Sequence, residues 1–192
     1  MSEILVVAAM REEIQGLLEK EGAEVVYVGI GKVNAASILA SEIARRTRKP
    51  KLIVNFGTAG SPKFPTHSLV EATGFVQHDM DLSPLGFEPG VTPFETEPKL
   101  LKVEKRFDDL PSGVCATGDH FATGKLKVEC DVVDMEAYAL AKVALRASIP
   151  FSSVKYVTDG SDHNAHNDWA ANLPRAAEAF RNLYLKLSSR KL

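Results

Sequence analysis

The sequence predicts an α/β fold in which a largely parallel sheet is covered by helices on both faces. Short runs of consecutive apolar residues, such as 4–9 and 52–56, are typical of strands that are buried on both sides. These runs alternate with segments whose apolar residues recur at helical spacing, which favours parallel strands joined by helical crossovers. The length of 192 residues suits one domain, so we expect a single domain over residues 1–192.

The expected strands are short apolar runs bounded by turn residues. They cover residues 4–9, 25–28, 52–56, 69–76, 113–117, 131–134 and 151–157. The expected helices cover residues 10–20, 33–46, a short charged segment at 97–107, 135–148 and a terminal helix at 169–188. Residues 78–97 are rich in Gly, Pro and Asp and are expected to form a long loop, which in a compact domain is often functional.

Charge and composition exclude several classes of partner. The formal net charge of −2 gives no electrostatic reason to expect nucleic acid or an anionic membrane surface. No apolar run approaches the roughly 20 residues that span a bilayer, and no basic segment precedes the first apolar run, so we expect neither a membrane span nor a signal peptide. Two cysteines, Cys115 and Cys130, are too few for a disulfide framework, which favours the cytoplasm.

Carboxylates follow three of the expected strands. Glu13 comes after the first strand, Glu136 after the strand at 131–134, and Asp159 after the last strand. Ligands of open α/β sheets bind outside the carboxyl ends of the strands, so these three acids are expected to converge. Such a convergence suggests acid/base chemistry on a substrate that is neutral or develops positive charge.

Each acid also has a purely structural interpretation. Glu136 could be an ordinary acidic residue at a helix N-terminus. Asp159 could belong, with Asp162, His163 and His166, to a capped loop before the last helix or to a metal site. The spacing matches no recognised zinc signature, so we expect no metal and no cofactor.

Two glycine-containing turns and one aromatic residue are further candidates. The segment G-I-G-K-V-N at 29–34 lacks the third glycine of a dinucleotide fingerprint, so it is either a tight turn or a turn that faces a ligand. The segment N-F-G-T-A-G-S at 55–61 is either a crowded turn or a loop whose backbone N–H groups approach a ligand, with Thr58 adding a hydroxyl. Phe121 could be an ordinary core residue, but its small and polar sequence neighbours favour stacking on a nucleobase.

Taken together, these segments resemble the nucleoside phosphorylase/nucleosidase superfamily, and within it the 5′-methylthioadenosine/S-adenosylhomocysteine nucleosidases. The matching stretches, in the order of the family, are A-A-M-R-E-E-I, G-I-G-K-V-N-A-A, N-F-G-T-A-G, H-D-M-D, A-T-G-D-H-F, V-V-D-M-E-A and V-T-D-G-S-D. Each is weak alone, but in register they cover most of the chain. The resemblance implies a three-layer α/β/α fold around a mixed, partly barrel-like sheet.

The resemblance also implies roles for individual residues. Glu13 matches the carboxylate that activates the attacking water, and Asp159 matches the acid that protonates N7 of the purine. This division of labour resembles that of inverting glycosidases, because the sugar becomes oxocarbenium-like and the leaving base must be neutralised. The residues that match substrate contacts at the ribose, the base and the nucleophile are Glu136, Met135, Phe121, Ala122, Thr58 and Ala59.

A homodimer is a further implication of the resemblance. Leu82, Leu85 and Pro93 match a loop that helps to close the 5′ pocket across a dimer interface. Apolar residues in a loop rich in Gly and Pro are also unusual for a fully solvated segment. The expected partner molecules are therefore a purine nucleoside and a second copy of the chain.

A phosphorylase with the same fold is the main alternative. A phosphorylase must bind dianionic phosphate, usually through arginines, and two arginine positions of the family hold Asn55 and Glu12 here. Both residues favour water as the nucleophile, while the nearby Arg11 keeps phosphorolysis open. A nucleoside-binding protein without activity is the second alternative, and the presence of all three carboxylates disfavours it.

Overall fold

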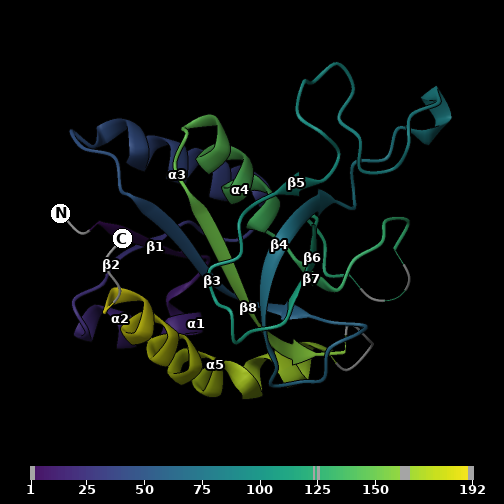
Figure 1. The fold of residues 1–192 in the computed structure, drawn as a ribbon. Helices are drawn as coiled ribbons and strands as arrows, with labels where there is room; N and C mark the ends of the chain where they lie inside the picture. The colour runs from purple at the N-terminus through teal and green to yellow at the C-terminus, as the bar shows by residue number, and fades with distance from the viewer. Residues whose placement is uncertain (1–2, 123, 125, 161–164, 190–192) are drawn as a thin grey trace.

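The computed structural model of the protein describes residues 3–122, 124, 126–160 and 165–189. Figure 1 shows a central sheet with α3 and α4 on one side and α1, α2 and α5 on the other, which makes three layers. The strands are β1 (Ile4–Ala8), β2 (Glu24–Tyr27), β3 (Leu52–Gly60), β4 (Leu69–Gln77), β5 (Leu101–Lys102), β6 (Ser112–Thr117), β7 (Val132–Asp134) and β8 (Phe151–Asp159). The helices are α1 (Arg11–Ile14), α2 (Leu17–Lys20), α3 (Lys32–Arg45), the 3₁₀ turn η1 (Ser83–Leu85), α4 (Ala137–Arg146) and α5 (Ala165–Ser188).

The sheet closes on itself. Its strand order is β2-β1-β3-β7-β6-β4-β5, and β8 pairs with both β3 and β4, so β3, β8, β4, β6 and β7 form a closed barrel. Parallel pairs predominate, but β4 runs antiparallel to β5 and to β8, and β3 meets β7 in antiparallel fashion. This confirms the mixed, partly barrel-like sheet implied by the family resemblance. The alternation of strands and helices alone predicts parallel pairs and does not predict the antiparallel ones.

Two hydrophobic clusters lie on opposite faces of the sheet, and β1 contributes to both. Successive side chains of a strand point to opposite faces. Leu5 and Val7 therefore pack in the cluster beneath α3 and α4, while Ile4, Val6 and Ala8 pack in the cluster beneath α5. A strand buried on both faces needs an unbroken apolar run, which is what the sequence has at this point.

The prediction of a helix at residues 97–107 is wrong. This segment contains the short strand β5, which pairs with β4, and Leu101 is buried. The buried carboxylate of Glu71 in β4 accepts the backbone N–H groups of Arg106 at 3.0 Å and Phe107 at 2.9 Å. The backbone of the segment is therefore satisfied by tertiary contacts instead of by a helical ladder.

The boundaries of three other helices also differ from the expectation. The single helix expected at 10–20 is broken into α1 and α2, because Gln15 and Gly16 adopt left-handed conformations with φ of 48° and 69°. Helix α4 begins at Ala137, two residues later than expected, and α5 extends back beyond its expected start at residue 169. No helix in the described part of the chain is both long and apolar enough to cross a membrane.

Candidate active site

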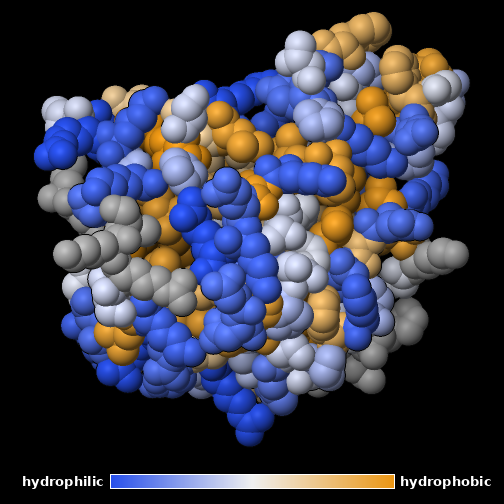
Figure 2. All heavy atoms as spheres, in the orientation of Figure 1, coloured by the Kyte–Doolittle hydropathy of each residue, from blue (hydrophilic) through white to orange (hydrophobic). Residues whose placement is uncertain are grey.

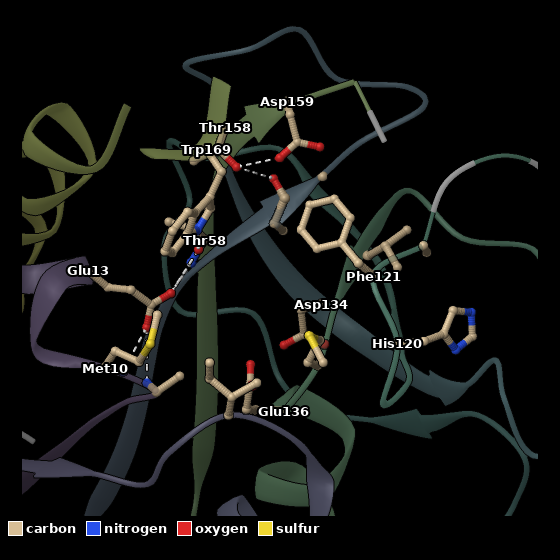
Figure 3. A pocket seen from close by; sticks show the side chains of 17 residues that line it. Met10, Glu13, Thr58, His120, Phe121, Asp134, Glu136, Thr158, Asp159 and Trp169 are labelled. Atoms are coloured by element: carbon tan, nitrogen blue, oxygen red, sulfur yellow. Dashed lines mark hydrogen bonds between the residues drawn. The ribbon is translucent and has the colours of Figure 1, made fainter. Parts of the chain in front are cut away.

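A cavity of about 250 Å³ lies at the carboxyl ends of the central strands, and Figure 3 shows the side chains that surround it. Segments from distant parts of the sequence supply its walls, including the start of α1, the ends of β3 and β8, and the turn between β7 and α4. The sequence-predicted residues that line it are Glu13, Asp159, Glu136, Met135, Phe121, Ala122, Thr58 and Ala59. The three strand-end acids therefore meet in one site.

Glu13 is held by four hydrogen-bond donors. Its Oε2 accepts the backbone N–H of Ala9 at 3.0 Å and of Met10 at 3.3 Å, as an acidic residue in the first turn of a helix does. Its Oε1 accepts both the backbone N–H of Thr58 and the Thr58 hydroxyl, each at 2.8 Å. All four contacts are donated to Glu13, whose carboxyl oxygens are the acceptors in each.

Asp159 is the last residue of β8 and is buried. The hydroxyl of Thr158 donates to Asp159 Oδ2 at 2.7 Å, and the Asp159 carbonyl accepts the backbone N–H of Ser61 at 3.0 Å. The side-chain amide of Asn172 in α5 donates to the Thr158 carbonyl at 2.9 Å, which ties the helix to this strand end. The carboxyl group is thus fixed at the edge of the cavity, on the side where Figure 3 places the Phe121 ring.

Glu136 is the N-cap residue of α4 and lies outside the helix itself. Its Oε1 accepts the backbone N–H of Gly31 at 2.8 Å, from the turn that opens α3. Burial, and next the negative charge of Asp134, disfavour the ionised form and raise the pKa of Glu136 from 4.5 to about 8. This environment therefore favours the protonated form of Glu136.

A buried ion pair lies beneath the cavity. Lys155 Nζ is 2.8 Å from Asp134 Oδ2, and the same ammonium donates to Asn55 Oδ1 at 2.9 Å. Asp134 also accepts the Thr117 hydroxyl at 2.6 Å and the backbone N–H of Ala137 at 2.8 Å. Burial opposes the charge on both groups, but their mutual attraction outweighs it, so the pKa of Asp134 is lowered and that of Lys155 is raised.

Gly57 lets β3 pass between this ion pair and the carboxylate of Glu13. A Cβ atom at Gly57 would lie 3.0 Å from Lys155 Nζ and 3.6 Å from Glu13 Oε1. Gly57 is therefore required by crowding from charged side chains, and the same close approach places the Thr58 N–H 2.8 Å from Glu13 Oε1.

A sequence model of the phosphorylase superfamily matches residues 7–189. The chain belongs to the phosphorylase superfamily. It is 28% identical to a 5′-methylthioadenosine/S-adenosylhomocysteine nucleosidase from Haemophilus influenzae over 196 residues, which cover 92% of this chain and 85% of that relative.

Solved structures with the same fold are found among nucleosidases and hydrolases. A mutant of the 5′-methylthioadenosine/S-adenosylhomocysteine nucleosidase of Helicobacter pylori, with 5′-methylthioadenosine in its active site, superposes with a TM-score of 0.85 at 23% identity over 98% of both chains. A futalosine hydrolase mutant of the same organism gives the same TM-score, identity and coverage. At this level of identity the two structures show that the chains share a fold.

The lining of the cavity in this phosphorylase superfamily member carries no Arg or Lys among the residues that the structure describes. Arg11 is exposed, lies 4.0 Å from Glu19 and sits over the ring of Tyr27, so it does not line the cavity. Asn55 is buried inside the barrel, where its amide donates to the Val7 carbonyl at 3.1 Å. The cavity as described therefore lacks the cationic groups that a phosphate dianion would need.

Leu82, Leu85 and Pro93 do not line the cavity of their own chain. They lie in the long loop between β4 and β5, which projects from the body of the molecule in Figure 1. Leu85 is 71% exposed and Phe94 is 99% exposed, and Figure 2 shows hydrophobic residues gathered on this projection. In this structure the three residues therefore do not contribute to the site of their own chain.

Sequence reasoning missed several polar groups in and beneath the site, and His120, which lines the cavity, is one of them. Trp169 lines the cavity and donates its indole N–H to Thr58. Lys155 and Asp134 form the ion pair, and a lysine in the middle of an apolar strand indicates that a buried acid lies nearby.

Asp162 and His163 lie outside the described residues. No cluster of His, Cys, Asp and Glu within the described ranges is arranged to hold a metal ion.

Proposed function

We propose that the protein is a purine nucleosidase that hydrolyses the N-ribosidic bond of adenosine-type nucleosides to free base and sugar. We further propose that it works as a single catalytic domain. The observation that carries this proposal is the meeting of Glu13, Asp159 and Glu136 around one cavity beside an aromatic ring. The names of the similar proteins, 5′-methylthioadenosine/S-adenosylhomocysteine nucleosidase and futalosine hydrolase, support cleavage of nucleosides.

Asp159 and Phe121 serve the base in this proposal. A purine anion is a poor leaving group, so protonation at N7 by a positioned acid lowers the barrier, typically by ~10²–10⁴-fold in rate. Asp159 stands at the cavity edge near the Phe121 ring, which offers a face for stacking on the base. The backbone of Ala122, the next residue, is then placed to contact the edge of the same base.

Glu13 serves the nucleophile. A carboxylate whose two oxygens are fixed by four donors cannot swing away, so it keeps a single orientation beside the cavity. A water molecule held there would give up its proton to Glu13 as it attacks the anomeric carbon. Thr58 and Ala59 line the adjacent wall.

Glu136 serves the sugar, with Met135 beneath it. One oxygen of Glu136 is occupied by the Gly31 N–H, which leaves the other for the ribose hydroxyls. Hydrogen bonds from these hydroxyls stabilise the ionised form, and a carboxylate near a developing oxocarbenium ion lowers the energy of the transition state. Substrate binding should therefore shift Glu136 toward its ionised form, against the burial that favours the protonated form.

Phosphorolysis is the alternative reaction for this fold, and the charge of the cavity disfavours it. Asn55 and Glu12 replace expected arginines, and Arg11 is held at the surface. A non-catalytic nucleoside-binding protein is the second alternative, disfavoured because each of the three acids is held by hydrogen bonds inside the cavity wall.

The 5′ side of the substrate is proposed to lie against a second copy of the chain. Leu82, Leu85 and Pro93 of the projecting loop would then close the pocket of the partner in a homodimer, which we place in the cytoplasm. An apolar lining suits a thioether substituent, as in methylthioadenosine or adenosylhomocysteine.

The direct test is a screen for release of free base from purine nucleosides with different 5′ substituents. We expect adenine from methylthioadenosine and adenosylhomocysteine, with slower release from adenosine. The Glu13→Gln variant is the control, since it keeps the volume of the side chain but cannot accept the proton of water. Absence of base release from every nucleoside, or equal release by this variant, would overturn the proposal.

A further inference from the structure

Trp169 is the sole tryptophan of the chain, and its side chain lines the cavity from α5. Figure 3 places the indole ring next to Thr58, above Glu13. The indole nitrogen Nε1 donates to Thr58 Oγ1 at 3.0 Å. The side chain is partly buried, so it combines an apolar wall with a polar contact.

The direction of this hydrogen bond sets the direction of the next one. An indole N–H can only donate, so Thr58 must accept from it. The hydroxyl of Thr58 has a single proton, and the nearest acceptor in contact is Glu13 Oε1 at 2.8 Å. The contact with Trp169 therefore leaves the Thr58 hydroxyl with one favourable orientation, in which its proton points at the carboxylate.

This series of hydrogen bonds ends at Glu13, the residue proposed to activate the attacking water. Glu13 Oε1 receives the Thr58 hydroxyl and the Thr58 N–H, and Oε2 receives two backbone N–H groups. Three of the four donors are backbone groups, so they are fixed once the fold forms. The hydroxyl is the only one of the four that can rotate, and Trp169 removes this freedom.

We propose that Trp169 is a positioning residue that, through Thr58, holds Glu13 in the orientation required to activate water. This inference rests on the proposed function. It assigns to α5 a part in the chemistry, because the network is complete only when this helix is docked against the ends of β3 and β8. The competing explanation is that the indole ring is an apolar wall alone.

Removing the N–H while keeping an aromatic ring separates the two explanations. Trp169→Phe should lower kcat on the order of three- to tenfold with little change in KM, which is the size expected from one hydrogen bond. Thr58→Val should lower kcat further, and Thr58→Ser should restore most of the activity because it keeps the hydroxyl. Tyr184→Phe, also on α5 and outside the cavity, is the matched control and should leave kcat unchanged.

The double variant Trp169→Phe/Thr58→Val decides whether the effect passes through Thr58. We expect it to match Thr58→Val alone, because the indole N–H has no catalytic partner once the hydroxyl is gone. The inference would be overturned if the loss in kcat of the double variant were the product of the two single losses. It would also be overturned if Trp169→Phe changed only KM, or if its kcat equalled that of the wild type. Melting temperatures close to wild type show that the single variants are folded.

Fluorescence gives a measurement that does not depend on turnover. All tryptophan emission comes from Trp169, so Thr58→Val should shift the emission maximum to shorter wavelength, and Thr58→Ser should not. Identical spectra for all three proteins would overturn the hydrogen bond on which the inference rests. If the wild type releases no base but the fluorescence shift is observed, the proposed function is wrong and the hydrogen bond between Trp169 and Thr58 is supported. If the wild type is active and Trp169→Phe has the same kcat, only the role of Trp169 is wrong.

Discussion

Lys155 Nζ lies 2.8 Å from Asp134 Oδ2 inside the barrel, and both side chains are 1% exposed. The two side chains are almost completely buried, so each charge depends on the other. It lies directly beneath the cavity, and the charge of Asp134 is one of the causes of the raised pKa of Glu136. The ion pair therefore links the stability of the barrel to the electrostatics of the site.

Breaking this pair should destabilise the fold strongly. Lys155→Met leaves Asp134 buried without its partner, which typically costs about 3–5 kcal/mol. Urea denaturation measures the change in the free energy of unfolding. The double variant Lys155→Met/Asp134→Asn, which removes both charges, should recover part of the loss.

The matched control is Lys186→Met, which removes a lysine from the exposed pair of Lys186 and Asp109. An exposed pair contributes about 0–1 kcal/mol, so this variant should unfold close to the wild type. Equal effects of the two lysine substitutions would contradict a structural role for the buried pair.

Glu136 should make the stability of the protein fall as the pH rises. Its pKa is about 8 in the folded protein and 4.5 for the ordinary side chain, so folding favours the protonated form. The contribution to stability is full below the lower value and is lost as the pH rises through about 8. Glu136→Gln has no proton to lose at this position, so its melting temperature should rise relative to that of the wild type as the pH increases from 4.5 to about 8.

The same variant tests the role of Glu136 in recognising the sugar. Its turnover should fall more than its affinity for nucleoside, because a neutral amide does not stabilise the charge that develops on the ribose. A melting-temperature difference that stays constant with pH would refute the raised pKa. If turnover were unchanged, Glu136 would have no part in catalysis, and its role would be limited to accepting the Gly31 N–H from the turn that opens α3.

Asp159→Asn should abolish the release of unactivated purine bases while nucleoside binding persists. The amide occupies the same volume and can still accept the Thr158 hydroxyl, but it cannot supply the proton for N7. Rapid-quench assays measure base release, and titration calorimetry measures binding. Turnover near that of the wild type on an ordinary purine nucleoside would rule out Asp159 as the general acid.

The projecting loop should hold two copies of the chain together. Leu85→Asp puts a charge on a residue that is 71% exposed in the single chain but is proposed to be covered in a homodimer. We expect light scattering to show a dimer for the wild type and a shift toward monomer, with lower activity, for the variant. Leu185→Asp on α5, at a leucine that is 39% exposed, is the control and should remain dimeric. A fully active wild-type monomer at micromolar concentration would contradict this assignment.

The convergence of the three acids on one cavity could be predicted from the sequence, because their positions follow from local rules. Glu13, Glu136 and Asp159 each stand at the end of an apolar run, and strand ends of a parallel arrangement meet at one edge. Their convergence is therefore a property of the strand pattern. The barrel closure is different, since it depends on β8 pairing with β4, and no local pattern marks an antiparallel partner.

The features that sequence reasoning missed depend on contacts between distant segments. The expected helix at 97–107 failed because the buried Glu71 captures its backbone N–H groups. The pairing of Lys155 with Asp134 requires β8 and β7 to bring the two residues together inside the barrel. Trp169 looked like the first residue of a terminal helix, and its contact with Thr58 exists only after α5 has docked.

The central claim is that water attacks the sugar, and the identity of the sugar product tests it most directly. Incubation of the protein with methylthioadenosine in phosphate buffer, followed by mass spectrometry, distinguishes the free methylthio-sugar from its 1-phosphate. Our account predicts equimolar adenine and free sugar, at a rate that does not depend on phosphate. Sugar 1-phosphate as the main product, or release of adenine only when phosphate is present, would contradict it.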